Sequence, residues 1–290
     1  MTTAAVRVVC VVFNPGDELD RFADTLTHAA QQPVELVLVD NGDDHTVARA
    51  VAERHGARLV VPGSNLGYGR AANLGARDAV AGWLLVANSD LEWPPGGLDA
   101  LLAAAERHPE AGSLGPALLN PDGTVYPSAR ELPSLTQGAG HALFARVWPG
   151  NPWTRAYQAS RETKERPAGW LSGACLLLRR EAFEAVGGFD DGYFMFFEDV
   201  DLGERLGRAG WANVYVPSVQ VLHLGGTSWR ARPAPMISAH HASAARYVAR
   251  RYPRWYQWPV RAAARLGLRI RERAELRAAA AAQAPSTPAH

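Results

Sequence analysis

Carboxylate and amide side chains follow two apolar runs of this chain, and a third acidic group follows a run of aromatic residues. Asp40 and the triplet Asn88-Ser89-Asp90 come directly after the apolar runs, whereas Glu198-Asp199-Val200-Asp201 comes after Tyr193–Phe197. An ionised carboxylate accepts hydrogen bonds and supplies the oxygen ligands that hard divalent cations prefer. It can also take a proton from a substrate. In order along the chain, these groups could hold a nucleobase, hold a metal and act as a base.

The first two groups each have a structural and a functional interpretation. Asp40 could form a turn after a strand, or its carboxylate could accept the imide N–H of a uracil or thymine. Asn88-Ser89-Asp90 is a D-x-D-like element, in which Asp90 would bind a divalent metal and Asn88 a ribose hydroxyl. We favour the functional interpretation because the carboxyl ends of parallel strands are where open α/β sheets bind ligands.

A glycine-bearing loop, Asn65–Asn73, precedes a predicted helix. Gly67 would allow close approach of the backbone, the helix N-terminus would favour a phosphate, and Arg70 would add a cation for phosphate oxygens. The alternative is a left-handed turn with a surface arginine. The loop lacks the G-x-G-x-x-G spacing and follows the third predicted strand, which counts against a dinucleotide-binding site.

The group at residues 198–201 is the candidate for proton transfer. An aromatic wall can raise the pKa of a carboxyl group toward that of a useful general base, and aromatic faces pack on sugar rings. We favour Asp199 as the base, with Glu198 as the alternative, and Asp201 as a helix-capping or positioning residue. His223 ends a later predicted strand and is either structural or a second metal ligand.

Strands and helices alternate through residue 118, which predicts βαβ units and an α/β fold with a mostly parallel central sheet flanked by helices. The segment Asn120–Arg166 is rich in proline, aromatic residues and arginine, and predicts mobile loops over the site. Early strands are predicted at Val6–Phe13, Val34–Val39, Arg58–Val61, Trp83–Ala87 and Ala111–Leu118, with helices at Leu19–Ala30, Val47–His55, from Gly69 to about Ala81, and Leu98–Arg107. Later strands are predicted at Gly169–Arg179, Trp211–Pro217 and Val219–His223, with helices at Glu181–Val186 and Val200–Ala209.

The C-terminal segment Ser238–Arg277 predicts a helix with ten arginines against two glutamates, and Trp255, Tyr256 and Trp258 lie in its middle. It could be a solvated helix that packs on the domain. We favour an interfacial helix, whose arginines meet anionic lipid headgroups while its tryptophans sit at the membrane boundary. Residues 278–290 have low complexity and predict a disordered tail.

Bulk properties exclude several classes of protein. The 290 residues carry a formal net charge of +1, so no global field favours nucleic acid as a partner. Cys10 and Cys175 lie in apolar runs, which predicts buried thiols and no disulfide. The start of the chain does not read as a signal peptide, and no apolar run approaches the roughly 20 residues that span a bilayer. We expect a cytoplasmic protein, peripheral on the inner face of the plasma membrane.

Taken together, these motifs resemble those of the family 2 inverting glycosyltransferases with a GT-A fold. The form of Asn65–Asn73, combined with Phe196–Leu202, is similar to the rhamnosyltransferase branch of that family. The resemblance implies an enzyme that moves L-rhamnose from dTDP-L-rhamnose to a polyprenyl-diphosphate-linked N-acetylglucosamine in cell-wall linker biosynthesis. It covers roughly residues 6–230 and rests on Val12-Phe13-Asn14, Val39-Asp40-Asn41, Asn65–Gly69, Asn88-Ser89-Asp90, Gly173-Ala174, Leu177–Arg179, Gly187–Asp190, Phe197–Leu202 and His223.

The resemblance also implies domains and residue roles. Residues 1–235 would form the transferase domain, with a nucleotide-binding half at 1–118 and an acceptor-binding half at 119–235, and residues 236–277 a basic extension. Asp90 and His223 would hold Mg²⁺ or Mn²⁺, and Asp199 or Glu198 would deprotonate the acceptor. The donor would contact Phe13, Asn14, Asp40, Gly67, Arg70, Asn73, Asn88 and Ser89, and the acceptor Trp170, Gly173, Phe197 and Asp201.

Two other functions stay open. A related transferase could use UDP-galactofuranose or UDP-N-acetylglucosamine on a polysaccharide, because thymine and uracil offer the same imide edge to Asp40. A nucleotide-binding or membrane scaffold protein without catalysis is the alternative from another class, although the intact set from Asp90 to Asp199 counts against it. The sequence does not fix the oligomeric state, and a homodimer is one candidate.

Overall fold

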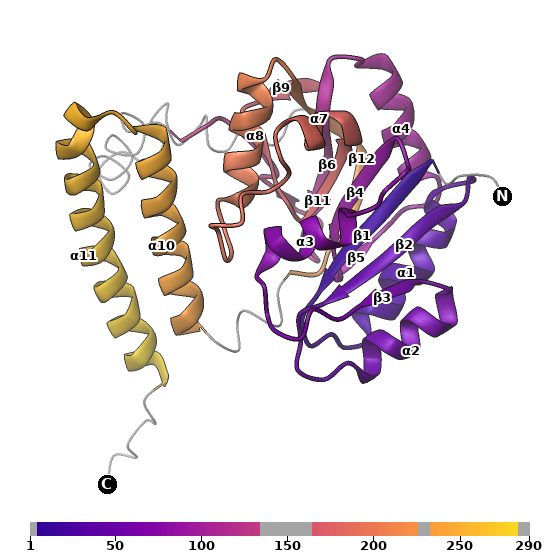
Figure 1. The fold of residues 1–290 in the computed structure, drawn as a ribbon. Coiled ribbons are helices and arrows are strands. Elements are labelled where there is room, and N and C mark those ends of the chain that lie inside the picture. Colours follow the sequence, from indigo (N-terminus) through magenta and orange to yellow (C-terminus); the bar gives the residue numbers. More distant parts are fainter. Residues whose placement is uncertain (1–4, 134–163, 226–232, 284–290) are drawn as a thin grey trace, which may run out of the picture.

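The computed structural model describes residues 5–133, 164–225 and 233–283. Its central sheet is flanked by helices, and two further helices lie beside this body (Figure 1). A separate pairing joins β8 (Ala129–Arg130) to β10 (Trp170–Leu171). β7 (Val125–Tyr126) pairs with β6 (Ala111–Leu119), and β9 (Arg166–Ala168) pairs with β12 (Ala212–His223). The strands of the main sheet run in the order β3 (Arg58–Val60), β2 (Val34–Asp40), β1 (Val6–Val12), β4 (Trp83–Asn88), β11 (Cys175–Arg179), β6 (Ala111–Leu119), β12 (Ala212–His223) and β5 (Leu91–Glu92).

Among the described residues the sheet is mixed, with four parallel and five antiparallel strand pairs, so the parallel arrangement that the sequence predicted holds for part of it. β1 is parallel to β2 and β4, β2 to β3, and β12 to β6. One antiparallel strand, β11, lies at the candidate site, and it is antiparallel to both β4 and β6. Since Cys175 pairs with Ala87, the start of β11 lies at the carboxyl end of β4. The α/β fold expected from the alternating pattern is confirmed.

Helices cover both faces of the sheet. α1 (Glu18–Ala29), α2 (Thr46–His55) and α4 (Gly97–Arg107) bury apolar residues on one face. α3 (Tyr68–Ala76), α7 (Arg180–Ala185) and α8 (Glu198–Arg208) pack on the other. The two faces alternate along β1, because successive side chains of a strand point to opposite sides.

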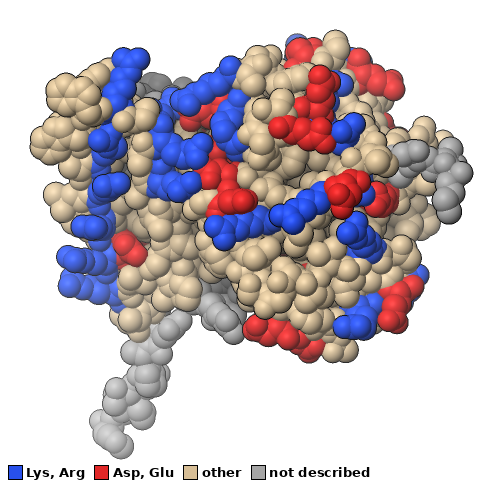
Figure 2. All heavy atoms as spheres, viewed as in Figure 1, with Lys and Arg blue, Asp and Glu red and all other residues tan. Residues whose placement is uncertain are grey.

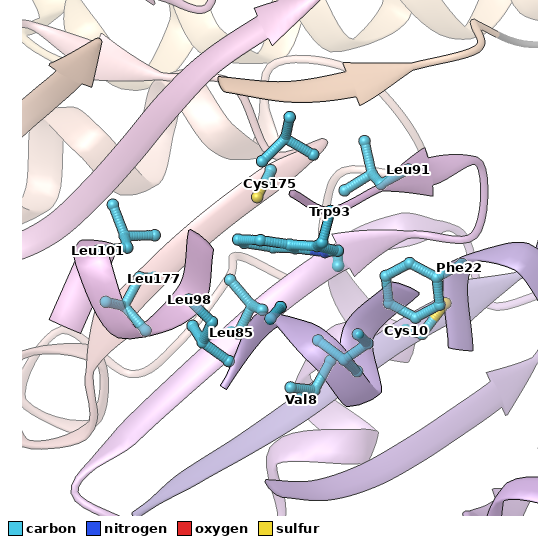
Figure 3. Close-up of a cluster of buried hydrophobic side chains, with 14 of the residues drawn as sticks. Val8, Cys10, Phe22, Leu85, Leu91, Trp93, Leu98, Leu101, Cys175 and Leu177 are labelled. Atoms are coloured by element: carbon cyan, nitrogen blue, oxygen red, sulfur yellow. The ribbon is translucent and has the colours of Figure 1, made fainter. Parts of the chain in front are cut away.

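The larger core lies under α1 and α4, where the ring of Trp93 packs among leucines and near both cysteines (Figure 3). Cys10 and Cys175 are each paired with Ala87, one on either side of β4. Two strand spacings are about 10 Å, which exceeds the Cα separation of a disulfide. Both thiols are free and buried, as the sequence predicted.

Three predicted boundaries differ from the structure. The strand expected over Gly169–Arg179 is interrupted at residues 172–174, where a turn separates β10 from β11. The strands expected at Trp211–Pro217 and Val219–His223 form one strand, β12, with an irregular register between Val216 and Gln220. α3 ends at Ala76 rather than near Ala81, because Asp78 takes a left-handed conformation, with a φ of 60°.

The single C-terminal helix predicted over Ser238–Arg277 is wrong. The structure has α10 (Pro233–Arg251), a short 3-10 turn η1 (Trp255–Gln257) and α11 (Trp258–Gln283), and the two helices lie side by side (Figure 1). Pro253 explains the break, since proline lacks the N–H that a helix interior requires. The disorder predicted from residue 278 is wrong for 278–283, and residues 284–290 lie outside the described part.

The segment expected to cover the site falls largely on residues 134–163, which also lie outside the described part. Within the residues that the structure does describe, no helix combines the length and the apolar character needed to cross a bilayer.

Candidate active site

The predicted metal ligands come together at the carboxyl edge of the sheet. β5 pairs with the end of β12, so that His223 lies opposite Leu91, and the N–H of Leu224 donates to the carbonyl of Asp90. This pairing places Nε2 of His223 3.2 Å from Oδ1 of Asp90. The amide nitrogen of Asn88 lies 3.3 Å from the same histidine nitrogen. Ser89, between them in sequence, is half-buried in the turn.

This arrangement fits a divalent cation that is shared with a substrate. Two ligands of one Mg²⁺ ion lie about 3 Å apart, which matches the separation of Asp90 and His223. Among the described residues, no cluster of three or more His, Cys, Asp and Glu side chains could hold a metal. Magnesium is commonly held by one or two protein ligands together with substrate phosphates. The site therefore suits a metal that needs a diphosphate to complete its coordination.

The candidate base is attached to the same edge through backbone hydrogen bonds. Oδ2 of Asp199 accepts the N–H of Gly173 at 3.0 Å, and Oδ1 accepts the N–H of Val200 at 2.8 Å. Gly173 lies in the turn before β11, and the next carbonyl, that of Ala174, accepts the N–H of Asn88. Tyr68 donates its hydroxyl to the carbonyl of Gly173 at 2.6 Å. Asp199 is therefore held close to the candidate metal site.

The two adjacent carboxyl groups differ in their surroundings. Burial raises the pKa of Glu198 to about 8, and the neighbouring Asp199 contributes to the rise. Oε2 of Glu198 is buried without a hydrogen-bond partner in the described part of the chain. Burial also raises the pKa of Asp199, but the N–H groups of Gly173 and Val200, and the charge of Arg130, oppose this rise. The hydrogen bonds and Arg130 favour the ionised form of Asp199, whereas burial and the charge of Asp199 favour the protonated form of Glu198, so Asp199 is the better candidate to accept a proton.

Arg130 lies near the candidate site, which the sequence did not reveal. Its guanidinium lies 5.6 Å from the ring centre of Tyr126 and 5.3 Å from that of Trp170. The ring of Tyr126 in turn meets His223 edge-on at 6.4 Å. Arg130 thus adds positive charge between the candidate metal ligands and Asp199. Its place depends on the pairing of β8 with β10, which no local pattern signalled.

Asp40 is the last residue of β2 and borders a tight turn on the predicted nucleotide side. Its side chain is fully buried, with Oδ1 accepting the N–H of Gly42 at 2.9 Å and Oδ2 lying 2.7 Å from Nδ1 of His45. A nucleobase would have to share Oδ2 with His45 or displace it. Asn14 faces the same turn with a left-handed φ of 47°, and its Oδ1 accepts the N–H of Asp43. Phe13, just before it, is half-buried.

The glycine loop approaches the chain's own backbone closely. The N–H of Tyr68 donates to the carbonyl of Phe194 at 2.9 Å, and a Cβ at Gly67 would overlap that carbonyl. The φ of Gly67 is 81°, which also favours glycine. Buried Asn41 fixes the loop from the other side, because its amide bonds the carbonyl of Gly67 and the N–H of Leu66. Asn41 is a second residue that the candidate list from the sequence had missed.

Arg70 and Asn73 bind the aromatic loop, Gly187–Phe197, from α3. Nε of Arg70 donates to the carbonyl of Asp191 at 2.6 Å. Asn73 bonds both the N–H and the carbonyl of Phe189. These contacts give both residues a structural role, and their contacts with the donor remain predictions.

The predicted acceptor residues lie around Asp199. Gly173 donates to it, and Phe197 immediately precedes α8 with a left-handed φ of 65°. Trp170 is half-buried, and its indole N–H donates to the carbonyl of Glu131. Asp201 is buried and paired with Arg205 at 2.6 Å, which fits the positioning role that its place in the helix predicted. A direct contact of Asp201 with an acceptor would require breaking this pair.

Comparison with known proteins identifies the family to which this chain belongs. Residues 7–187 match the model of Glycosyl transferase family 2, and this chain belongs to that family. It is 49% identical to the N-acetylglucosaminyl-diphospho-decaprenol L-rhamnosyltransferase of Mycobacterium tuberculosis, over 93% of this chain and 92% of that protein. The Myxococcus xanthus O-antigen biosynthesis protein RfbC is 33% identical over 80% of this chain but only 18% of its own length. The family inferred from the motifs is confirmed.

Solved structures support the fold. A mannosyltransferase from Pyrobaculum calidifontis, in complex with GDP-Man and Mn²⁺, matches with a TM-score of 0.57 and 20% identity over 99% of this chain and 78% of that one. GalNAc-T7 with UDP, GalNAc and Mn²⁺ matches with a TM-score of 0.58 and 16% identity over 78% of this chain and 45% of that one. The expected GT-A type of fold is confirmed.

Proposed function

We propose that this protein transfers L-rhamnose from dTDP-L-rhamnose to a polyprenyl-diphosphate-linked N-acetylglucosamine, with inversion at the anomeric carbon. The observation that carries the proposal is the 49% identity, across nearly the whole length of both chains, to a rhamnosyltransferase named for that acceptor. Asp199 would serve as the base and Asp90 as a metal ligand that this reaction needs. A UDP-sugar transferase remains the alternative for the donor.

The chemistry follows from the position of Asp199. Its ionised carboxylate would take the proton of the acceptor hydroxyl as the oxygen attacks the anomeric carbon. The bond to the donor diphosphate breaks on the opposite face, so one displacement turns a β-linked donor into an α-rhamnoside. The N–H groups of Gly173 and Val200 each donate to one oxygen of Asp199. These two hydrogen bonds fix the orientation of the carboxylate. Protonated Glu198 adds no second negative charge beside the base.

Asp90 and His223 would hold Mg²⁺ or Mn²⁺ on the donor diphosphate. When bound, such a metal offsets the negative charge that develops on the leaving group. Arg130 adds a positive charge that acts on Asp199. The 3.2 Å contact between Asp90 and His223 supports this assignment.

The acceptor is a lipid, and the C-terminal helices supply a surface that suits a membrane. Basic side chains form a column over α11 (Figure 2). Trp258, Leu266 and Ile270 of this helix are each more than 60% exposed. At 100° per residue, Arg265, Arg269 and Arg273 fall on the same side of the helix as these apolar residues. We propose that this outer face binds an anionic lipid surface on the cytoplasmic side of the plasma membrane.

The test is transfer measured with a panel of donors. The purified protein is incubated with a short-chain polyprenyl-diphospho-N-acetylglucosamine and either dTDP-L-rhamnose, UDP-galactofuranose or UDP-N-acetylglucosamine, with Mn²⁺ or with EDTA. Rhamnosylated product that needs the metal is expected from dTDP-L-rhamnose alone. Faster transfer from a UDP-sugar would overturn the donor assignment. If no donor is turned over while donor binding is detected by calorimetry, the non-catalytic alternative would replace the proposal.

A further inference from the structure

We propose that α10 contributes to the active site, because His240 and Ser243 hold the aromatic loop in the conformation that orients Asp199. The two would be positioning residues, because they act through the loop and do not touch the reacting atoms. This inference deepens the transfer reaction proposed above and rests on it. It gives the C-terminal segment a role in catalysis in addition to its proposed role in membrane binding.

The aromatic loop ends in an unusual backbone conformation. Phe196 and Phe197 have φ values of 67° and 65°, and they directly precede Glu198 and Asp199. A bulky residue in the left-handed region is strained and persists only where its surroundings hold it there. Phe197 is also the residue before the first turn of α8, so its backbone sets the direction of that helix. Whatever holds these two phenylalanines therefore also orients Asp199.

The described contacts show that α10 holds them. The imidazole of His240 lies 5.5 Å from the ring of Phe196 and 5.5 Å from that of Phe197. Ser243, one turn further along, donates its hydroxyl to the carbonyl of Met195 at 2.8 Å. Tyr247, one more turn along, packs its ring 5.7 Å from that of Phe197. Since residues three and four apart share one side of a helix, this side of α10 is built to meet the loop.

Ion pairs fix the same helix at both ends of the loop. Arg246 pairs with Asp190 at 2.8 Å and lies over the ring of Tyr193. Arg250 pairs with Asp190 and also with Asp201, two residues after Asp199. Each of these acidic groups is at least partly buried, which strengthens the pairing relative to a surface pair. α10 is thus connected to residues on either side of the strained segment.

The loop passes this restraint to the rest of the site. The carbonyl of Phe194 accepts the N–H of Tyr68 at the start of α3, and Tyr68 donates to Gly173, the partner of Asp199. A loosened loop would therefore disturb the base from two directions, through α8 and through Gly173. A displacement of about 1 Å at a catalytic group can lower the rate by about 100-fold.

Substitution of His240 tests the proposal, because the contribution of its aromatic ring can be measured separately from that of a titratable group. Burial and the neighbouring His241 lower the pKa of His240, so the ring is neutral at neutral pH and packs as an aromatic group. His240→Ala removes the ring, and His240→Phe restores an aromatic face without a titratable group. His108→Ala is the matched control. His108 pairs with Glu110 and Glu165 just before β6, at the amino ends of the parallel strands and away from the candidate site.

The measurements are steady-state transfer with the full-length protein and hydrogen–deuterium exchange of the amides at 193–201. His240→Ala is expected to lower kcat at least about tenfold, to leave the donor Kd within about twofold and to speed exchange in this segment. His240→Phe should restore most of kcat, and Ser243→Ala should give a milder loss of kcat. His108→Ala should change none of these quantities.

Unchanged kcat and unchanged exchange in His240→Ala would overturn the proposal. It would also be overturned if kcat, donor binding and melting temperature fell together and His240→Phe rescued none of them, because that pattern is general destabilisation. The exchange measurement needs no substrate. A wrong donor assignment would therefore appear as inactivity of the unaltered protein, with the exchange differences intact.

Discussion

The backbone N–H of Gly173 donates to Oδ2 of Asp199 over 3.0 Å, and this bond joins the turn before β11 to the first turn of α8. Gly173 is suited to the contact by its size, since a Cβ there would lie 3.3 Å from Cβ of Asp199. The next residue, Ala174, is bonded to Asn88 at the candidate metal site. The candidate base and metal site are thus linked through one three-residue turn, which makes their separation a property of the fold.

Asp199→Asn should abolish transfer while leaving donor binding intact. The amide cannot take the acceptor proton, and general base catalysis contributes roughly 10²–10⁴-fold. We expect kcat to fall about 1,000-fold, with the calorimetric Kd of the nucleotide-sugar unchanged within about twofold. Turnover near that of the unaltered protein would remove Asp199 from the mechanism.

Glu198→Gln should behave differently, because Gln imitates the protonated acid. The pKa of Glu198 is raised from 4.5 to about 8, so the group is neutral at pH 7, and the variant should keep kcat within about fivefold there. When folding raises the pKa of a carboxyl group, the folded protein loses stability as the pH rises from the pKa of the unfolded state to that of the folded state. The melting temperature of Glu198→Gln relative to the unaltered protein should therefore rise between pH 5 and pH 8. A kcat loss as large as that of Asp199→Asn would assign the base to Glu198.

Arg130→Gln should move the acidic limb of the pH–rate profile to higher pH. Activity requires ionised Asp199 and is lost as pH falls through its pKa, which the charge of Arg130 lowers. Without that charge the pKa rises, so more activity is lost at mildly acidic pH. Arg130→Lys keeps the charge and is the control. Profiles that coincide for Gln and Lys would show that Arg130 does not tune the base.

Gly67→Ala should be much more destabilising than Gly63→Ala. Both glycines have positive φ, 81° and 79°, so each substitution incurs a backbone cost of at least about 1 kcal/mol. Only at Gly67 would the new Cβ overlap the carbonyl of Phe194, while nothing lies within 4 Å at Gly63. We expect the free energy of unfolding of Gly67→Ala to be lower by about 2 kcal/mol more, measured in urea. Equal losses would mean that the loops separate easily.

The sequence predicted those parts of the site that local patterns determine. Asp40, Asp90 and His223 each follow an apolar run, so their place at strand ends could be read directly. That Asp90 meets His223 depends on β5, which has only two residues and no pattern of its own. Arg130 was missed for the same reason, because its partner Trp170 lies 40 residues away across an irregular segment.

The C-terminal segment shows a different limit. Its arginines and tryptophans were visible, but a helical pattern cannot say which charges face solvent. The structure turns Arg246, Arg250 and Arg251 inward onto acidic residues, while Arg265, Arg269 and Arg273 of α11 are exposed. Pro253 lies between the two helices, and a proline within a helical pattern predicts such a break even where the composition around it is continuous.

Because the arginines of α10 pair with acidic residues, whereas Arg265, Arg269 and Arg273 lie exposed on α11, the membrane prediction concerns α11 alone. Removing the chain from Ser238 would also remove the inward arginines of α10, so loss of binding could follow from misfolding. Substitution of Arg265, Arg269 and Arg273 by Gln leaves α10 intact. It should lower sedimentation with vesicles containing phosphatidylglycerol by about 100-fold in partition coefficient, since each charge near an anionic surface contributes about 1 kcal/mol.

Leu266→Ser with Ile270→Ser should weaken binding to the same vesicles even in high salt, because this part of the affinity is apolar. Val80→Ser is the matched control, as Val80 is 68% exposed but lies in the turn before β4, away from the helical pair. The arginine variant should lose its difference from the unaltered protein as salt rises, whereas the Leu266 and Ile270 variant should not. Equal sedimentation of all three variants would place the membrane contact elsewhere on the molecule, and binding to uncharged vesicles that matches binding to anionic ones would exclude the arginines as its source.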